Sequence, residues 1–168
     1  MRWEKIKKYS AGFTLVETLV VIAILGILSS IVLISVGDIR ERARDSRRKS
    51  EVARIGQFLS FSCYLPSAGE GEYDIIALAQ EIVAQNPQYG QFLSNIPKDP
   101  KTGTDTQSKY IYTVDGQGKK CALYANLENP NERATLSIAA PTPGGGTGVL
   151  KADHPGWNGT PFYFQVSN

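Results

Sequence analysis

The most unusual setting in this sequence belongs to a single carboxylate in an apolar run. Residues 13–36 contain Glu17 as their only charged residue. An acidic side chain at the centre of a membrane-buried helix costs about 2.5–3.5 kcal/mol, and less near a helix end. An acid in this setting needs a cation, so ion pairing is the chemistry that we predict for Glu17.

Two cysteines are the next candidates for chemistry. Cys63 and Cys121 lie too far apart in the sequence for a structural zinc site, which needs paired ligands a few residues apart. In an oxidising compartment they would pair, and a bridge that closes about 58 residues contributes about 4 kcal/mol in the chain-entropy model. We predict a Cys63–Cys121 disulfide that ties the end of a long helix to a strand; two separate buried thiols are the alternative.

No catalytic set is expected. A Ser/His/Asp or Cys/His set needs a histidine beside the nucleophile, and His154 is the only histidine. His154 also lacks a cysteine or aspartate partner at ligand spacing. The glycine-rich residues 144–148 lack the Gly-Lys-Ser/Thr ending of a phosphate-binding loop. We therefore predict no enzymatic activity, no catalytic residues and no resident cofactor.

Three aspartates in predicted loops have the ligand type that calcium prefers: Asp99, Asp105 and Asp115. Their spacing does not match an EF-hand. Aspartate is also common in turns, so turn formation is the main interpretation and a calcium site the alternative. Asn158 begins an Asn-Gly-Thr sequon, the acceptor pattern for N-linked glycosylation.

The apolar run predicts a long N-terminal helix. As a helix, residues 13–36 extend about 36 Å, which is enough to cross a hydrocarbon core of about 30 Å. The basic residues 1–12 precede it, and no small-residue cleavage site follows it, so we expect the run to be retained. Residues 37–64 are rich in helix formers, with no proline before Pro66, and predict an amphipathic continuation. The whole helix spans about 50 residues, with bends at the glycines of positions 26 and 37.

The remaining residues, 65–168, predict a globular head. Residues 73–86 have the period of a short amphipathic helix. Residues 109–114 and 120–127 alternate with a period of two and flank the turn 115–118, which predicts a β-hairpin. The further strand candidates are 133–139 and an edge strand at 161–166. The predicted class is α+β, with a long N-terminal helix packed on a C-terminal antiparallel sheet.

The net charge of +2 is unevenly distributed. Basic residues within 40–54 alternate with Glu41, Asp45 and Glu51, which is typical of a solvated helix face or an intersubunit ion network. Contact with DNA phosphates is a weaker alternative. Both flanks of the apolar run are equally basic, so charge alone does not orient it in a membrane.

The residues from Gly12 to Glu17, followed by the apolar helix, resemble the processing motif of type IV pilins and type II secretion pseudopilins. The resemblance implies that a membrane peptidase cleaves the leader 1–12 between Gly12 and Phe13 and methylates the new amino group of Phe13. Glycine suits such a site because the missing side chain lets the protease approach the backbone. The Phe13 amine, of the same or a neighbouring subunit, then becomes the cation that Glu17 needs.

The same resemblance implies a structural subunit of a pilus-like filament that polymerises through its N-terminal helix. The implied partners are other copies of the chain, the prepilin peptidase and an assembly platform of the inner membrane. The precursor would lie in the cytoplasmic membrane, with its N-terminus cytoplasmic and its head outside, and the assembled filament would be extracellular. One alternative is a pseudopilin of a type II secretion-like machine. Residues 97–100, followed by 110–112, resemble the entry to the sheet in major-pseudopilin-like heads, but no motif assigns the chain to one subfamily. Another alternative is a monomeric membrane-anchored binding protein.

Overall fold

The structure, a computed structural model, describes residues 12–59 and 62–168, and it leaves out the side chains of 31–36, 58–59 and 92–94. The chain divides into two compact units, Met1–Asp38 and Ile39–Asn168. The predicted leader lies outside the described residues, apart from Gly12 at its end.

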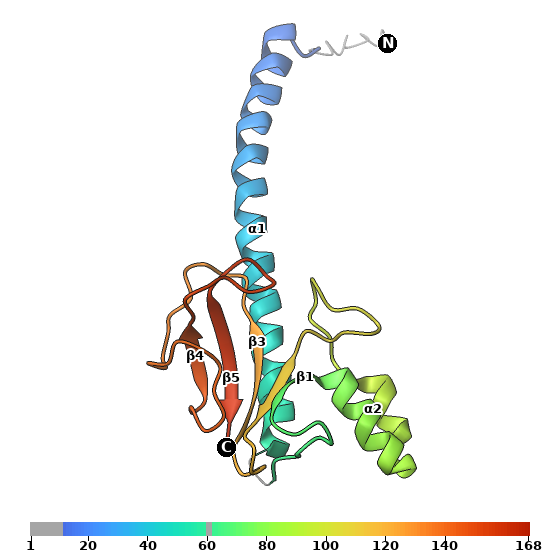
Figure 1. The fold of residues 1–168 in the computed structure, drawn as a ribbon. Helices are drawn as coiled ribbons and strands as arrows, with labels where there is room; N and C mark the ends of the chain where they lie inside the picture. The colour runs from blue at the N-terminus through green and yellow to red at the C-terminus, as the bar shows by residue number, and fades with distance from the viewer. Residues whose placement is uncertain (1–11, 60–61) are drawn as a thin grey trace, which may run out of the picture. The chain divides into compact units, whose positions relative to one another are not determined.

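One helix, α1, runs without interruption from Leu15 to Leu59 and belongs to both units (Figure 1). It continues through both glycines at which bends were predicted. The helix was predicted to extend to residue 64, but residues 62–64 are not helical. Cys63, within this segment, is bonded to Cys121 of the sheet. The Tyr112 hydroxyl also accepts a hydrogen bond from the backbone N–H of Tyr64 and donates one to its carbonyl, which holds this segment against the sheet.

The first unit contains the N-terminal part of α1, and its apolar side chains are exposed. The exposed fraction is 83% for Phe13, 78% for Leu15 and 66% for Ile22. Within the part of the chain that the structure describes, no helix combines the length and apolar character needed to cross a membrane. The predicted span 13–36 includes the side chains of 31–36, which lie outside this description.

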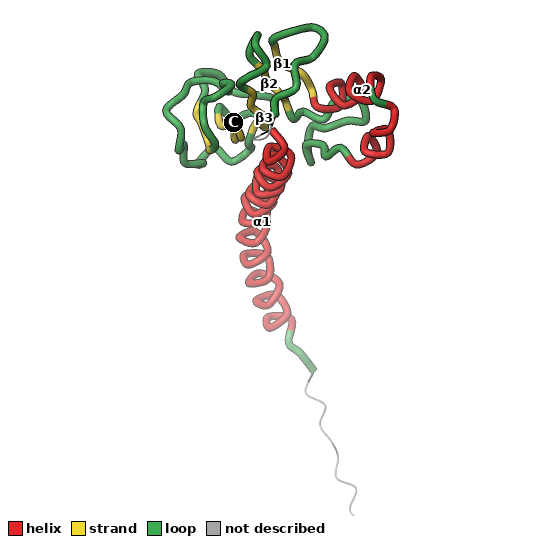
Figure 2. Tube along the Cα trace, turned by 90° about the horizontal axis from the view of Figure 1, so that it is seen from below, coloured by secondary structure: helices red, strands yellow, loops and turns green. Residues whose placement is uncertain are grey.

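The second unit is built on a five-stranded sheet in which every neighbouring pair is antiparallel. The order β1-β2-β3-β5-β4 comprises β1 (Gly71–Asp74), β2 (Ile111–Val114), β3 (Cys121–Asn126), β5 (Phe162–Ser167) and β4 (Gly148–Lys151). The helix α2 (Ile75–Gln85) follows β1 directly and continues into the 3-10 helix η1 (Pro87–Asn95). Figure 2 shows both helices on the β1 side of the sheet. The predicted α+β class is confirmed.

Two strand predictions were wrong in detail. Residues 133–139 form no strand, because the N–H groups of Thr135 and Leu136 both donate to the carbonyl of Val149 instead of alternating along a partner. The strand beside this segment is β4, which the glycine-rich sequence concealed. The strand predicted at 161–166 corresponds to β5, which lies between β3 and β4 and is therefore not at an edge. The short β1 was not predicted.

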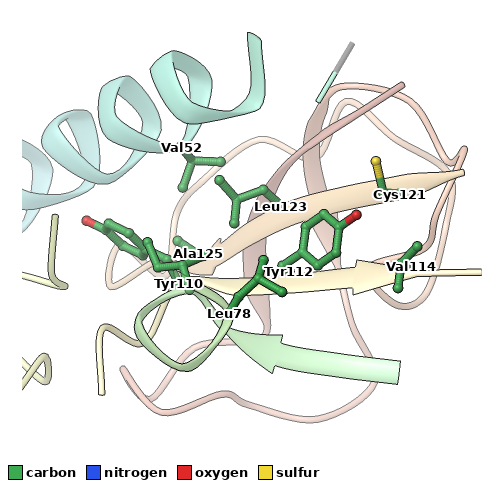
Figure 3. Close-up of a cluster of buried hydrophobic side chains, with 9 residues drawn as sticks. Val52, Leu78, Tyr110, Tyr112, Val114, Cys121, Leu123 and Ala125 are labelled. Atoms are coloured by element: carbon green, nitrogen blue, oxygen red, sulfur yellow. The ribbon is translucent and has the colours of Figure 1, made fainter. Parts of the chain in front are cut away.

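The hydrophobic core lies between the sheet and the part of α1 that begins at Ile39. Alternate residues of β2 and β3 face the helix, including Tyr112, Leu123 and Ala125, and Val52 packs against them from α1 (Figure 3). Position 56 is close enough to the sheet that an added Cβ would overlap Val166. A glycine therefore allows the helix to approach β5 here.

The predicted disulfide is present. Cys63 and Cys121 are bonded, with their Cα atoms 5.7 Å apart, and the described residues contain no free cysteine. Cys121 is fully buried in β3. The bond joins the segment that follows α1 to the middle of the sheet.

Loss of this disulfide is expected to destabilise the head by up to about 4 kcal/mol, because the unfolded chain regains the entropy of a long loop. Urea unfolding of Cys63→Ala/Cys121→Ala, compared with wild type, measures this loss. Reduced wild type is the matched control and should unfold at the midpoint of the double variant. Thiol labelling of native exported protein should find no free thiol; two free thiols there would contradict the structure.

Candidate functional site: the start of α1 and the ion network of the head

The first turn of α1 is closed by a reciprocal pair of hydrogen bonds between Thr14 and Glu17. The backbone N–H of Thr14 donates to Glu17 Oε2 at 2.8 Å, and the backbone N–H of Glu17 donates to Thr14 Oγ1 at 3.3 Å. This arrangement is a capping box, in which residues three apart satisfy two helix N–H groups that have no partner within the helix. The carboxylate also lies where the positive end of the helix dipole favours an anion.

The capping box leaves half of the carboxylate available. The Thr14 hydroxyl also donates to Glu17 Oε2, at 2.9 Å, so both Thr14 donors use the same oxygen. None of the residues that the structure describes donates a hydrogen bond to Glu17 Oε1. A charged amine can therefore bind Oε1 without breaking the cap, since a carboxylate accepts at both oxygens.

The predicted processing residues lie at an accessible part of the chain. Gly12 is exposed and precedes α1, with no described atom within 4 Å of the position that a Cβ would occupy. Phe13 is also largely exposed. Cleavage between them and pairing of Glu17 remain predictions at this point.

A second polar site lies in the head, around Arg48 of α1. The Arg48 side chain is fully buried, and its Nε and Nη2 donate to the two carboxylate oxygens of Asp99 at 2.7 and 2.9 Å. Its Nη1 donates to Asp45 at 2.8 Å, and Nη2 lies 2.6 Å from Glu128 Oε1. One guanidinium thus joins three carboxylates from three parts of the chain. The planar fork of arginine suits such bidentate pairing.

The surrounding groups satisfy the rest of these carboxylates. Arg44 donates to both oxygens of Glu128 at 2.8 and 2.7 Å, and Lys101 lies 3.0 Å from Glu128 Oε2. Asp45 accepts the backbone N–H groups of Glu128 and Asn129. Buried charge is tolerated when it is paired and hydrogen-bonded in this way. The network therefore fixes the head part of α1 to the loops before β2 and after β3.

The network changes the pKa of its carboxyl groups. Burial alone would raise the pKa of Glu128, but hydrogen bonds from Arg44, Lys101 and Arg48 outweigh it and lower the pKa to about 2. Burial also acts to raise the pKa of Asp99, and the Arg48 guanidinium and backbone N–H groups hold that pKa well below its usual range.

These shifts predict that the head loses stability in acid. A carboxyl with a folded pKa below its unfolded value of about 4 stabilises the fold above that value, and the contribution falls as the pH drops toward the folded pKa. We expect the unfolding midpoint in urea to fall steadily from pH 5 to pH 2.5. In Arg48→Met the same scan should be flatter, because Asp99 and Asp45 lose the guanidinium with which they pair. Equal pH slopes for the two proteins would contradict this prediction.

The three aspartates considered for calcium have separate partners. Asp99 belongs to the Arg48 network, Asp105 pairs with Lys98 at 2.5 Å, and Asp115 accepts the backbone N–H groups of Lys119 and Lys120 in the β2–β3 turn. In residues 12–59 and 62–168, no group of three or more His, Cys, Asp or Glu side chains is placed to hold a metal ion. The structure thus offers no described ligand set for the calcium alternative.

The structure also bears on two other features of the sequence, the basic run considered for DNA contact and the sequon at Asn158. Arg44 and Arg48 of the basic run 40–54 bind carboxylates of the head, so part of that run is not available for DNA. Asn158 of the sequon is buried, and its amide donates to Asp99 and to the carbonyl of Asn126. The amide nitrogen that a glycan would occupy is therefore engaged in the folded head.

Thr14 and Arg48 were not singled out in the sequence. Thr14 had a readable signal, because Thr-x-x-Glu before an apolar run is the capping-box pattern. Arg48 had none, because its partner Asp99 lies 51 residues away and a basic residue in a charged helix resembles a solvated one.

Comparison with known proteins agrees with these observations. The family described as the prokaryotic N-terminal methylation motif matches residues 7–33. The chain is 28% identical over 108 residues to the type II secretion system core protein G of Vibrio cholerae serotype O1, a match that covers 62% of this chain and 73% of that protein. No solved structure matched the chain. The methylation motif, the secretion relative and the helix-plus-sheet fold together support the resemblance of this chain to type IV pilins and type II secretion pseudopilins.

Proposed function

We propose that the chain is a structural subunit of a pilus-like filament, which polymerises through α1 after cleavage at Gly12–Phe13 and methylation of Phe13. The observation that carries this proposal is the start of α1, where an exposed apolar surface contains one carboxylate whose second oxygen accepts no hydrogen bond from the described residues. The methylation motif supports the processing step.

The apolar surface favours side-by-side packing of helices. Leu15, Val16 and Ile22 are each more than 60% exposed. Fully burying one such side chain contributes about 1.5–3 kcal/mol when it leaves water. Before assembly, we propose, residues 13–36 hold the precursor in the cytoplasmic membrane, with the N-terminus cytoplasmic and the head outside. In the filament, neighbouring helices replace the lipid.

Glu17 would fix how these helices align. Apolar packing alone permits sliding, whereas a buried polar pair selects one register, as in coiled coils. Cleavage creates an amine at Phe13, and Glu17 Oε1 is free to accept it from a neighbouring subunit. The Thr14 hydrogen bonds hold the carboxylate in place for that contact.

The sequence similarity to a type II secretion protein supports a second candidate function. A match to a type II secretion system core protein supports a pseudopilin of a secretion machine as the second candidate. Deleting the gene separates the two candidates: loss of long surface filaments in electron micrographs supports the pilus, and loss of protein export without visible filaments supports the pseudopilus. Full-length, unprocessed chain in the membrane, with neither phenotype, would support a monomeric anchored binding protein instead.

Gly12→Val is expected to block processing, because a β-branched side chain prevents close approach of the peptidase to the backbone. Intact-mass analysis should find wild-type chain that starts at methylated Phe13 and variant chain that retains residues 1–12. Gly26→Val, a matched change within α1 where an added Cβ has no described atom within 4 Å, should be processed normally. Residues 1–12 on wild-type surface material would overturn the processing step.

A further inference from the structure

A cavity of about 450 Å³ lies on the face of the sheet opposite α1. The pairing register places Glu72 of β1 beside Thr113 of β2 and Thr113 beside Ala122 of β3, so these residues share one face with Tyr124. The core residues Tyr112 and Leu123 point to the other face, toward α1. The cavity is therefore separate from the hydrophobic core and from the Arg48 network.

Three aromatic rings line this cavity. Tyr124 is buried in β3, and Tyr163 of β5 and Trp157 of the preceding loop are half-buried beside it. The ring centroids of Tyr124, Trp157 and Tyr163 lie 5.7–6.3 Å from one another, and Tyr163 meets both other rings edge to face. Such a group of π faces attracts cations, because the face of each ring is the negative side of its quadrupole.

The acidic residues that line the cavity also favour a cation. Glu72 and Asp153 are both exposed and line it, and none of its described lining residues is a lysine or arginine. Glu72 lines the cavity together with Tyr124 and Tyr163, and burial and then the Glu72 charge raise the pKa of both tyrosines. The remaining lining consists of three alanines and two prolines, whose side chains offer no hydrogen bonds, together with His154.

We propose that this cavity is a binding site for an organic cation of the trimethylammonium type, held by Tyr124, Trp157 and Tyr163 with Glu72 as its counter-charge. A weakly hydrated quaternary ammonium fits apolar walls better than a primary ammonium, which loses a strong hydration shell on entry. The site does not depend on filament assembly, because all of its residues belong to the second unit.

Choline is the probe, with 3,3-dimethyl-1-butanol as its uncharged equivalent of the same shape. The test uses the full chain with Trp3→Phe in a nonionic detergent, so that Trp157 is the one tryptophan that reports binding. We expect saturable quenching of Trp157 fluorescence by choline and at least about fivefold weaker binding of the alcohol. Phosphocholine distinguishes the source of the group: equal binding indicates a lipid headgroup, and weaker binding indicates a free cation.

Glu72→Gln removes the charge at nearly constant size and should weaken choline binding about fivefold, the effect of one surface ion pair. Glu70→Gln, two residues away and outside the lining of the cavity, is the matched control and should bind as wild type. The proposal fails if choline does not quench, if the alcohol binds as well as choline, or if Glu72→Gln and Glu70→Gln bind equally. The comparison of choline with the alcohol uses the unaltered cavity, so it holds even if a variant folds poorly.

Discussion

Glu17→Ala is expected to yield chain that is processed and held in the membrane but does not form filaments. The change makes the apolar segment more apolar and leaves Gly12 and Phe13 intact. The Phe13 amine would then lie among packed helices without a counter-charge, and an uncompensated buried charge costs about 3–5 kcal/mol. That cost recurs at every subunit contact, so the expected loss of filament is at least a hundredfold.

The measurement compares mature subunit in the membrane with subunit in the filament fraction for each variant. Glu17→Asp keeps the charge but shortens its reach by one methylene, so we expect an intermediate amount of filament. Thr18→Ala is the matched control in the same turn, because the Thr18 hydroxyl bonds to the backbone of α1 and not to Glu17. Normal filaments from Glu17→Ala would show that assembly does not need the proposed ion pair.

Arg48→Met is expected to destabilise the head by about 3–5 kcal/mol. Methionine replaces the aliphatic stem of arginine but has no charge, so it leaves Asp99, Glu128 and Asp45 close together in a buried site without the cation that joins them. Urea unfolding of the full chain in detergent, followed by near-UV circular dichroism, measures the loss. Because Arg48 is fully buried, water can replace little of the stabilisation that the three carboxylates lose.

Arg47→Met is the control for this measurement. Arg47 lies one residue away on the same helix, and its side chain is 60% exposed in an i,i+4 pair with Glu51. Such pairs contribute about 0.3–0.5 kcal/mol, so its loss should be close to the error of the experiment. Equal effects of the two substitutions would show that Arg48 does not hold α1 to the head.

The sequence predicted the elements that have strong local signals. The long helix, α2 and the β2–β3 hairpin each have a hydrophobic period or a turn signature, and Gly118 adopts the positive φ of 66° that its turn needs. The strands β1 and β4 have only four residues and glycine at their start, so they lacked such a signal. Their positions depend on pairing with distant strands. The same dependence explains why 133–139, with a plausible alternating pattern, forms no strand.

The candidate sites divide in the same way, into those with a local sequence signal and those that depend on residues far apart in the chain. Glu17 was found because an acid stands out in an apolar run, and the pairing of the two cysteines followed from their number and from their places in predicted elements. The Arg48 network joins residues 45–48, 99 and 128, which approach one another only after the sheet has formed. The cavity beside Tyr124 likewise gathers side chains from three strands and two loops. Local sequence patterns carry no information about such sites.

The most direct test of the filament proposal is carbodiimide cross-linking in cells, which joins a carboxylate to an amine in contact with it. A membrane-permeant carbodiimide should give a ladder of dimers and larger oligomers that resists denaturation. Trypsin digestion of the dimer band should release two copies of the peptide 13–40 joined between Phe13 of one and Glu17 of the other. If the chain instead stays monomeric, or cross-links form only within single chains, the proposed pairing of Glu17 with a neighbouring subunit is wrong.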